Sequence, residues 1–199
     1  ITRYTIVPGL IPVLALIQVQ LLAGLSVSRE REDGSFDMML MTPADSIEIL
    51  IGKAVMPTLI ACGQAFLIFE IGFLWFELPF KGSFLLLGLV IFGFSLCMVG
   101  LGLGVSAVAD NIQQSIVMII VMMLPMVILS GLMTSVRAMR HWMQTATILN
   151  PLRYSIQAIR AVYFEGAGLM DILPLVWPVA LVGLGSMSPA TYLFRHKIS

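Results

Sequence analysis

Residues 84–108 read FLLLGLVIFGFSLCMVGLGLGVSAV and contain no charged side chain. The hydrocarbon core of a bilayer is about 30 Å thick, and a helix of about 20 apolar residues crosses it. This stretch therefore predicts a membrane-spanning helix. The whole chain has the same character, because 59% of its 199 residues are hydrophobic and 11% are charged. A soluble domain carries about 25% charged residues, so the composition excludes a soluble globular fold, and its apolarity excludes a disordered chain.

Four further apolar stretches are long enough, or nearly long enough, to cross a membrane. Together with the first, the five predicted spans are residues 4–27, 54–76, 84–108, 116–133 and 172–194. The predicted fold class is all-α, a polytopic membrane helix bundle, and we expect one membrane domain over residues 1–199. An odd number of spans places the two chain ends on opposite faces. Lys and Arg are divided almost evenly between the loops of the two faces, so the positive-inside rule leaves the orientation open.

The polar stretch 28–43 between the first two predicted spans reads SREREDGSFDMMLMTP. Its charges alternate in sign up to a break at Gly34, after which the sequence turns apolar. This pattern predicts a short amphipathic helix parallel to the membrane, followed by a second helix that starts near Thr42-Pro43 and continues into the next span. Exposed Phe and Met residues on such a helix favour a partner protein, since methionine-rich surfaces adapt to a docked protein. A solvated charge run is the alternative.

The long connection 134–171 is too polar to span the membrane and too apolar to be a free loop. It predicts an interfacial or re-entrant helix that begins at Asn150-Pro151, an N-cap followed by a proline at the first helical position. Gly166 is suited to end it. Helical spacing places Arg153, Gln157 and Arg160 on one face, and Ile156, Ile159 and Tyr163 on another. A helix at the headgroups with snorkelling arginines fits this pattern equally well. In the span before it, Pro125 and Ser130-Gly131 predict a bend.

The sequence contains no motif for catalysis, cofactor binding or metal binding. Gly52-Lys53 lacks the other residues of a phosphate-binding loop, and the two histidines are far apart. Cys62 and Cys97 lie in separate apolar runs, which favours packing over a disulfide or a zinc site. The 11 basic and 11 acidic residues balance, so the chain has no excess of positive charge that would attract nucleic acid. We expect no catalytic residue, cofactor or metal on this chain and no nucleic-acid partner.

A few polar and small residues lie inside the predicted spans. Glu70 is an intramembrane acid, and such a group marks either a functional site or a partnered structural carboxyl near the interface. Gln64 either bonds between helices or lines a path. Gly100 and Gly104 form a small-residue face that predicts close helix contact and, through it, pairing of two subunits.

The polar stretch 28–43 resembles a motif of the transmembrane subunits of ABC transporters of the type-2 exporter class, such as bacterial drug-efflux permeases. That motif is an Arg/Glu cluster, Gly-Thr, a Glu two residues on, Leu, Thr-Pro and a later Gly-Lys. Here Ser35 stands for the usual Thr and Asp37 for the usual Glu, and Gly52-Lys53 follows. The run Asn150-Pro151-Leu152-Arg153-Tyr154, with Ala158-Ile159-Arg160 and Gly166, is similar to the family's re-entrant segment before the last span.

The resemblance implies a permease subunit that forms the path for ATP-driven export across the bacterial inner membrane. It implies a second permease subunit, identical or not, surrounding lipid, and a cytoplasmic ABC ATPase subunit that holds ATP and Mg. Coupling to that ATPase is expected of Arg29, Glu30, Arg31, Glu32, Gly34, Phe36, Asp37 and Leu40, and the outer re-entrant helix is expected to use Asn150, Pro151, Arg153 and Arg160. The family domain has six spans, so we expect a first span and an extracellular domain to precede this chain.

Two other classes of function are alternatives. An ion-driven secondary transporter needs internal repeats or several intramembrane charges, and a membrane-embedded enzyme needs converging catalytic groups. The sequence has one acidic residue well inside a span and no set of catalytic groups that would come together.

Overall fold

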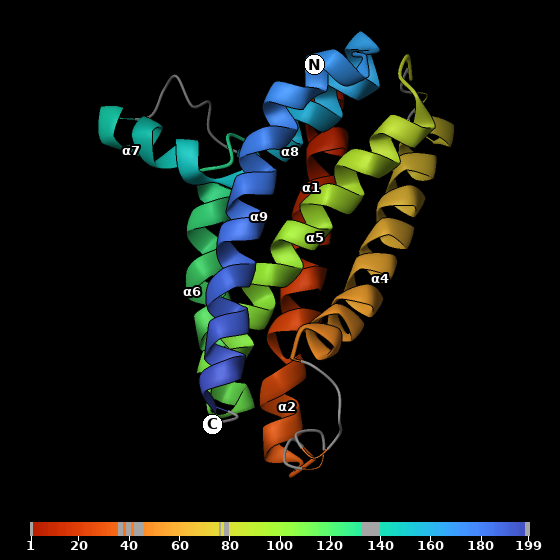
Figure 1. Cartoon of the computed structure of the whole chain (residues 1–199). Helices are drawn as coiled ribbons and strands as arrows, with labels where there is room; N and C mark the ends of the chain where they lie inside the picture. The colour runs from red at the N-terminus through yellow and green to blue at the C-terminus, as the bar shows by residue number, and fades with distance from the viewer. Residues whose placement is uncertain are drawn as a thin grey trace.

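The computed structural model describes residues 2–35, 38, 41, 46–75, 77, 80–132 and 140–197. These residues form helices and turns and contain no strand (Figure 1). In chain order the elements are α1 (Thr2–Gly24), α2 (Ser26–Glu32), α4 (Ser46–Leu74), α5 (Phe84–Val108), α6 (Ile112–Ile128), α7 (His141–Ala146), the 3₁₀ turn η2 (Thr147–Leu149), α8 (Pro151–Arg160), the π turn η3 (Ala161–Glu165) and α9 (Leu169–Lys197).

The all-α membrane bundle predicted from the sequence is confirmed. Within the described ranges, 4 helical stretches are long and apolar enough to cross a membrane, namely Ile6–Glu32, Ile47–Leu74, Phe84–Val108 and Leu169–Ser186. Helix α6 is apolar but has 17 residues, so five spans remain a prediction. The N-terminus lies at the bundle end that carries α8, and α9 ends at the opposite end beside α2 (Figure 1). We call these the α8 end and the α2 end.

Helix α5 is the centre of the bundle and packs against α9, α1 and α4. It approaches α1 closely at Gly102, where an added Cβ would lie 3.0 Å from the Ala23 Cβ and 3.2 Å from the Gly24 nitrogen. Within the described chain no atom lies within 4 Å of a Cβ built at Gly104, so the close helix contact predicted through Gly100 and Gly104 is not made at Gly104 inside this chain, and a contact with a second subunit stays a prediction. Alternate glycines of this run point to different sides of α5.

The boundaries of α6 differ from those predicted for the fourth span. The helix begins at Ile112, because the Asn111 side chain caps it by accepting a hydrogen bond from the Gln114 nitrogen at 2.7 Å. It continues past Pro125 to Ile128 and ends where Gly131 takes a positive φ of 83°. Pro125 therefore does not end the helix, and the chain turns at Gly131, after the C-cap residue Leu129.

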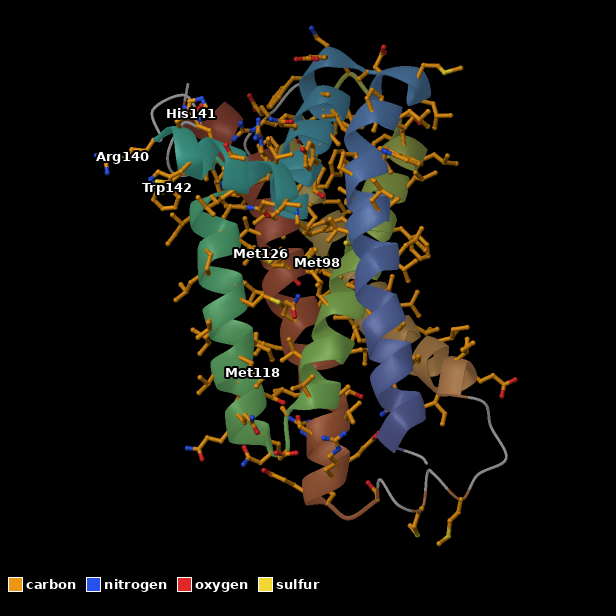
Figure 2. The ribbon with its side chains drawn as sticks, turned by 60° about the vertical axis from the view of Figure 1, so that its left-hand side comes forward. Met98, Met118, Met126, Arg140, His141 and Trp142 are labelled. Atoms are coloured by element: carbon orange, nitrogen blue, oxygen red, sulfur yellow. The ribbon has the colours of Figure 1, made fainter. Side chains whose placement is uncertain are left out.

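Helix α8 lies inside the α8 end of the bundle, in contact with α9, α1 and α5 (Figure 1). Its two faces are those predicted, since Ile156, Ile159 and Tyr163 are buried while Gln157 is exposed. Helix α7 lies across the nearby end of α6, with Arg140 and Trp142 pointing away from the bundle (Figure 2). An exposed Trp at this level is typical of a membrane interface.

Candidate functional site: the charged α2 end and the outer helix

Residues 29–32 of the expected coupling segment lie on α2, which prolongs α1. A single turn residue, Leu25, separates the two helices, and helical bonding continues through it because the Arg29 nitrogen donates to the Leu25 oxygen at 3.0 Å. These four residues therefore extend a span, whereas the short amphipathic helix expected with Phe36, Met39 and Leu40 falls largely outside the described residues. The break predicted at Gly34 is confirmed by its φ of 72°. Phe36, Asp37 and Leu40 lie outside the described residues.

Arg31 binds the end of α5. Its guanidinium donates from Nη1 to the Ala109 oxygen at 2.6 Å and from Nη2 to the Ala107 oxygen at 3.0 Å. The last carbonyls of a helix lack partners within it and carry a partial negative charge, so a cation stabilises them. Arg31 therefore caps the C-terminus of α5.

Glu32 binds the start of the next helix. Its Oε1 accepts a hydrogen bond from the Ile112 nitrogen at 2.9 Å, at the N-terminus of α6. A carboxylate suits this position, because the first N–H groups of a helix are unpaired and carry a partial positive charge. Two neighbouring residues of opposite charge on α2 thus hold the α5–α6 turn, residues 109–111, from its two sides.

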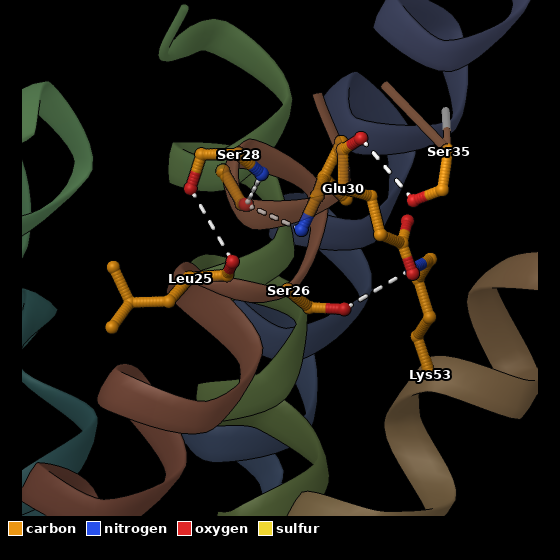
Figure 3. A network of polar contacts seen from close by, with 8 residues as sticks. Leu25, Ser26, Ser28, Glu30, Ser35 and Lys53 are labelled. Carbon is orange, nitrogen blue, oxygen red and sulfur yellow. Dashed lines mark hydrogen bonds and ion pairs between the residues drawn. The ribbon is translucent and has the colours of Figure 1, made fainter. Parts of the chain in front are cut away.

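Glu30 and Lys53 join α2 to α4. Their side chains form an ion pair, and the Lys53 ammonium also donates to the Ser26 Oγ at 3.1 Å (Figure 3). The Lys53 side chain is 10% exposed and the Glu30 side chain 32%, so the contact is partly buried. Gly52-Lys53, which follows the polar stretch in the sequence, is therefore close to the charged residues of α2.

Ser106 is a residue of this site that the sequence reasoning missed. Its Oγ accepts hydrogen bonds from the Val27 nitrogen at 2.9 Å and from the Ser28 nitrogen at 3.1 Å. Ser28 and Ser106 are both fully buried. The only signal was a serine near the end of an apolar run, which does not indicate a partner 78 or more residues away in the chain.

At the α8 end, Asn150 makes two contacts at once. Its Oδ1 accepts from the Leu152 nitrogen at 3.1 Å, which is the predicted N-cap, and Pro151 is the first residue of α8. Its Nδ2 donates to the Met126 oxygen at 2.7 Å. That oxygen is available because the Ser130 nitrogen bonds to the Val127 oxygen instead. Asn150 therefore links the end of α6 to the start of α8.

The two arginines of α8 are both half-buried. Arg153 donates from Nη1 to the Thr147 Oγ1 at 2.5 Å. Burial lowers the pKa of the Arg160 guanidinium from its ordinary value. Both side chains thus lie partly inside the protein, and half-burial also fits arginines that bury their stems and extend their charged heads to the headgroups.

The chain after Arg160 fastens α8 to the α4–α5 connection. It widens into the π turn and reverses at Gly166, whose φ of 63° is the left-handed value predicted for it. The Lys81 nitrogen donates to the Tyr163 oxygen at 3.1 Å. Gly82 lies so close that an added Cβ would be 2.1 Å from the Val162 oxygen. Sequence reasoning missed Gly82, because nothing in a short turn reveals what packs on it.

The intramembrane polar residues lie apart from both clusters. Glu70 is exposed on α4, and among the described residues no hydrogen bond or ion pair is found for it. Gln64 is half-buried, and its Oε1 has no partner in the part of the chain that the structure describes. In the same part, no three His, Cys, Asp or Glu side chains come together in a way that could hold a metal ion.

Two hollows flank α4. One of about 380 Å³ is apolar and lies between α4 and α5, where Ala54, Thr58 and Phe92 contribute to its lining. The other, of about 230 Å³, lies between α4 and α1–α2 and includes the Glu30 and Lys53 pair beside Leu22 and Met56. Both hollows therefore border the half of α4 near the α2 end.

Known proteins share this sequence pattern. Residues 1–164 match the family described as ABC-2 type transporter. The chain is 33% identical over 196 residues to the probable multidrug ABC transporter permease YbhR of Escherichia coli strain K12, covering 98% of this chain and 53% of that protein. It is 25% identical over 182 residues to the inner membrane transport permease YhhJ of the same strain, covering 89% and 48%. The chain spans about half the length of the curated relatives it matches.

Proposed function

Because this chain belongs to the ABC-2 type transporter family, we propose that it is a permease subunit of an ABC exporter in a bacterial inner membrane. It contributes to the path through which an apolar, drug-like substrate leaves the cell, and ATP is hydrolysed on a separate subunit. The names of its relatives, a probable multidrug permease and an inner membrane transport permease, support this substrate class and this membrane.

The observation that carries the proposal is the convergence of three helices on α2. Arg31 and Glu32 hold the ends of α5 and α6, and Glu30 is paired with Lys53 on α4. A force applied to α2 is therefore transmitted to three other helices at once. The α2 end is the cytoplasmic end in this proposal, and the ATPase subunit docks there.

The surface at this end suits a docked protein. Arg29 is an exposed charge on α2, and Met38 and Met41 are 71% and 86% exposed. Exposed methionines near a charged helix suit an adaptable protein interface. Phe36, Asp37 and Leu40, which match the family motif, belong to the same stretch.

A second permease subunit completes the path in this proposal. The apolar hollow between α4 and α5 is open to the surroundings of the chain rather than enclosed by it, and α6 exposes a row of apolar residues. Such surfaces fit lipid or a second transmembrane subunit. Cross-linking of the full-length protein in native membranes should trap a pair of subunits, and an active preparation that contains only monomers would contradict pairing.

Transport in vesicles tests the proposal. The full-length protein is reconstituted with and without its ATPase subunit, and efflux of a lipophilic fluorescent dye is measured after addition of ATP or after imposing a proton gradient. We expect efflux only with the ATPase subunit and ATP. Efflux driven by the gradient without that subunit would instead establish an ion-driven secondary transporter.

A further inference from the structure

Helix α6 is attached at both ends by polar side chains from other elements. At the α2 end, the Glu32 carboxylate accepts from the Ile112 nitrogen, and Arg31 holds the adjacent carbonyls of α5. At the α8 end, the Asn150 amide donates to the Met126 oxygen. Both attachments are made to the backbone of α6, so they act on the position of the helix itself rather than on one of its side chains.

Between these ends α6 is held by apolar packing on a single face. It contacts α1 and α5, and it stands to one side of the bundle (Figure 2). Ile119 is buried on the inner face, whereas Val117 and Val121 are 57% and 65% exposed. Among the described residues, no hydrogen bond is found from residues 116–125 to another helix. Non-directional contacts of this kind let a helix shift along its axis at lower cost than hydrogen bonds do.

We propose that α6 is a relay helix that carries a displacement of α2 to α8, with Glu32 and Asn150 as the positioning residues at its two ends. The inference rests on the proposed function, because it takes α2 as the element that the ATPase moves. A helix is stiff along its axis, so a push on the Ile112 end reaches the Met126 end without being absorbed in a loop. Asn150 is also the N-cap of α8, and the push therefore arrives at the start of the outer helix.

One substitution separates the two roles of Asn150. Asp is as good an N-cap as Asn, so Asn150→Asp keeps the acceptor for the Leu152 nitrogen and preserves α8. It removes the amide that donates to the Met126 oxygen and places an acceptor against an acceptor.

At the α2 end, Glu32→Ala removes the hydrogen bond to the Ile112 nitrogen, while Glu32→Gln retains an acceptor oxygen and is the conservative rescue. Asp33→Asn is the matched control, because it changes an exposed neighbouring charge.

The measured quantity is the labelling rate of a cysteine placed on α8. Gln157→Cys is introduced into the full-length protein with its ATPase subunit, because Gln157 is exposed on α8 and takes no part in either attachment. Its labelling rate by a membrane-impermeant maleimide is compared between the nucleotide-free complex and the complex trapped with ATP and vanadate. The same protein without Gln157→Cys gives the background.

We expect trapping to change the labelling rate in the otherwise unaltered protein, in Asp33→Asn and in Glu32→Gln. In Asn150→Asp and Glu32→Ala the change is lost, while the protein level is retained. A full nucleotide response in both of these variants would overturn the relay. Absence of a response in the unaltered protein would overturn it too, and co-purification then locates the failure: if the ATPase subunit binds and hydrolyses ATP, only the relay is wrong, and if it does not bind, the proposed function is wrong as well.

Discussion

Arg31 is a charged residue whose place in the fold is set by two backbone carbonyls. Its guanidinium presents N–H groups in a fixed fork, which lets it bind Ala107 and Ala109 at the same time. The neighbouring Arg29 is exposed on the same short helix. Two arginines that are equivalent in the sequence pattern are therefore distinct in the structure, one holding a helix end and the other available to a partner.

We expect Arg31→Ala to lower the stability of the protein by about 1 kcal/mol, the usual worth of a cation at a helix C-terminus. Arg31→Lys should recover part of this loss, because an ammonium restores the charge without the two-pronged geometry. The measurement is the thermal unfolding midpoint of the purified full-length protein in detergent. Arg29→Ala is the control and should leave the midpoint unchanged; an equal effect of the two alanine variants would contradict the capping role of Arg31.

Gly34 follows α2 with a φ of 72°, and Phe36, Asp37 and Leu40, which we propose couple to the ATPase subunit, come after it in the sequence. Proline is fixed near a φ of about −65°, so Gly34→Pro redirects the chain at this point. Loss of an interface anchor such as Phe36 costs about 2 kcal/mol or more of binding. We expect Gly34→Pro and Phe36→Ala to insert normally while ATP hydrolysis no longer responds to substrate. Normal export by both variants would mean that this stretch is only a solvated connector.

The elements of the α8 end are held together by close backbone contacts. Helix α8 is amphipathic, and its apolar face fills the space between α1, α5 and α9. The π turn after it brings Tyr163 and Val162 against the α4–α5 connection, where Lys81 and Gly82 lie. Because these contacts join α8 to two spans, a change in any of them is expected to displace α8.

Gly82→Ala tests this packing. The added methyl group would lie 2.1 Å from the Val162 oxygen, so the backbone of one segment must move. Overpacking of this kind costs about 1–3 kcal/mol. We expect a lower unfolding midpoint and faster labelling of a cysteine at Gln157. Gly88→Ala is the matched control, since nothing described lies within 4 Å of its added Cβ; if the two variants behave alike, the contact at Gly82 is not a constraint.

The whole molecule shows which parts of such a fold can be predicted from the sequence. Local signals were reliable: the Asn150-Pro151 start of α8, the turn at Gly166 and the two faces of α8 depend on residues within one or two turns of each other. The partners of Arg31, Glu32 and Ser106 depend on how α5 and α6 meet α2, about 80 residues away in the chain. The pattern of apolar residues does not determine how these helices are aligned with one another, because in lipid every face of a spanning helix is apolar.

The orientation of the whole molecule follows from the proposed function, since the charge count leaves it open. Helices α7 and α8 then face the outside, and α2 faces the cytoplasm. A cysteine at Arg140, which is exposed beside α7, should react with an impermeant reagent added outside intact cells, and one at Arg29 should not. Labelling of Arg29→Cys from outside would invert the topology and with it the placement of the ATPase.

The most direct test of the central claim is a contact between α2 and the ATPase subunit. A photo-crosslinking amino acid is placed at Arg29 or Met41 at the α2 end, or at Gln157 at the α8 end, of the full-length protein in native membranes. The account predicts cross-links to the ATPase subunit from Arg29 and Met41 and none from Gln157. Cross-links from Gln157 alone, or none from any position in an active complex, would contradict it.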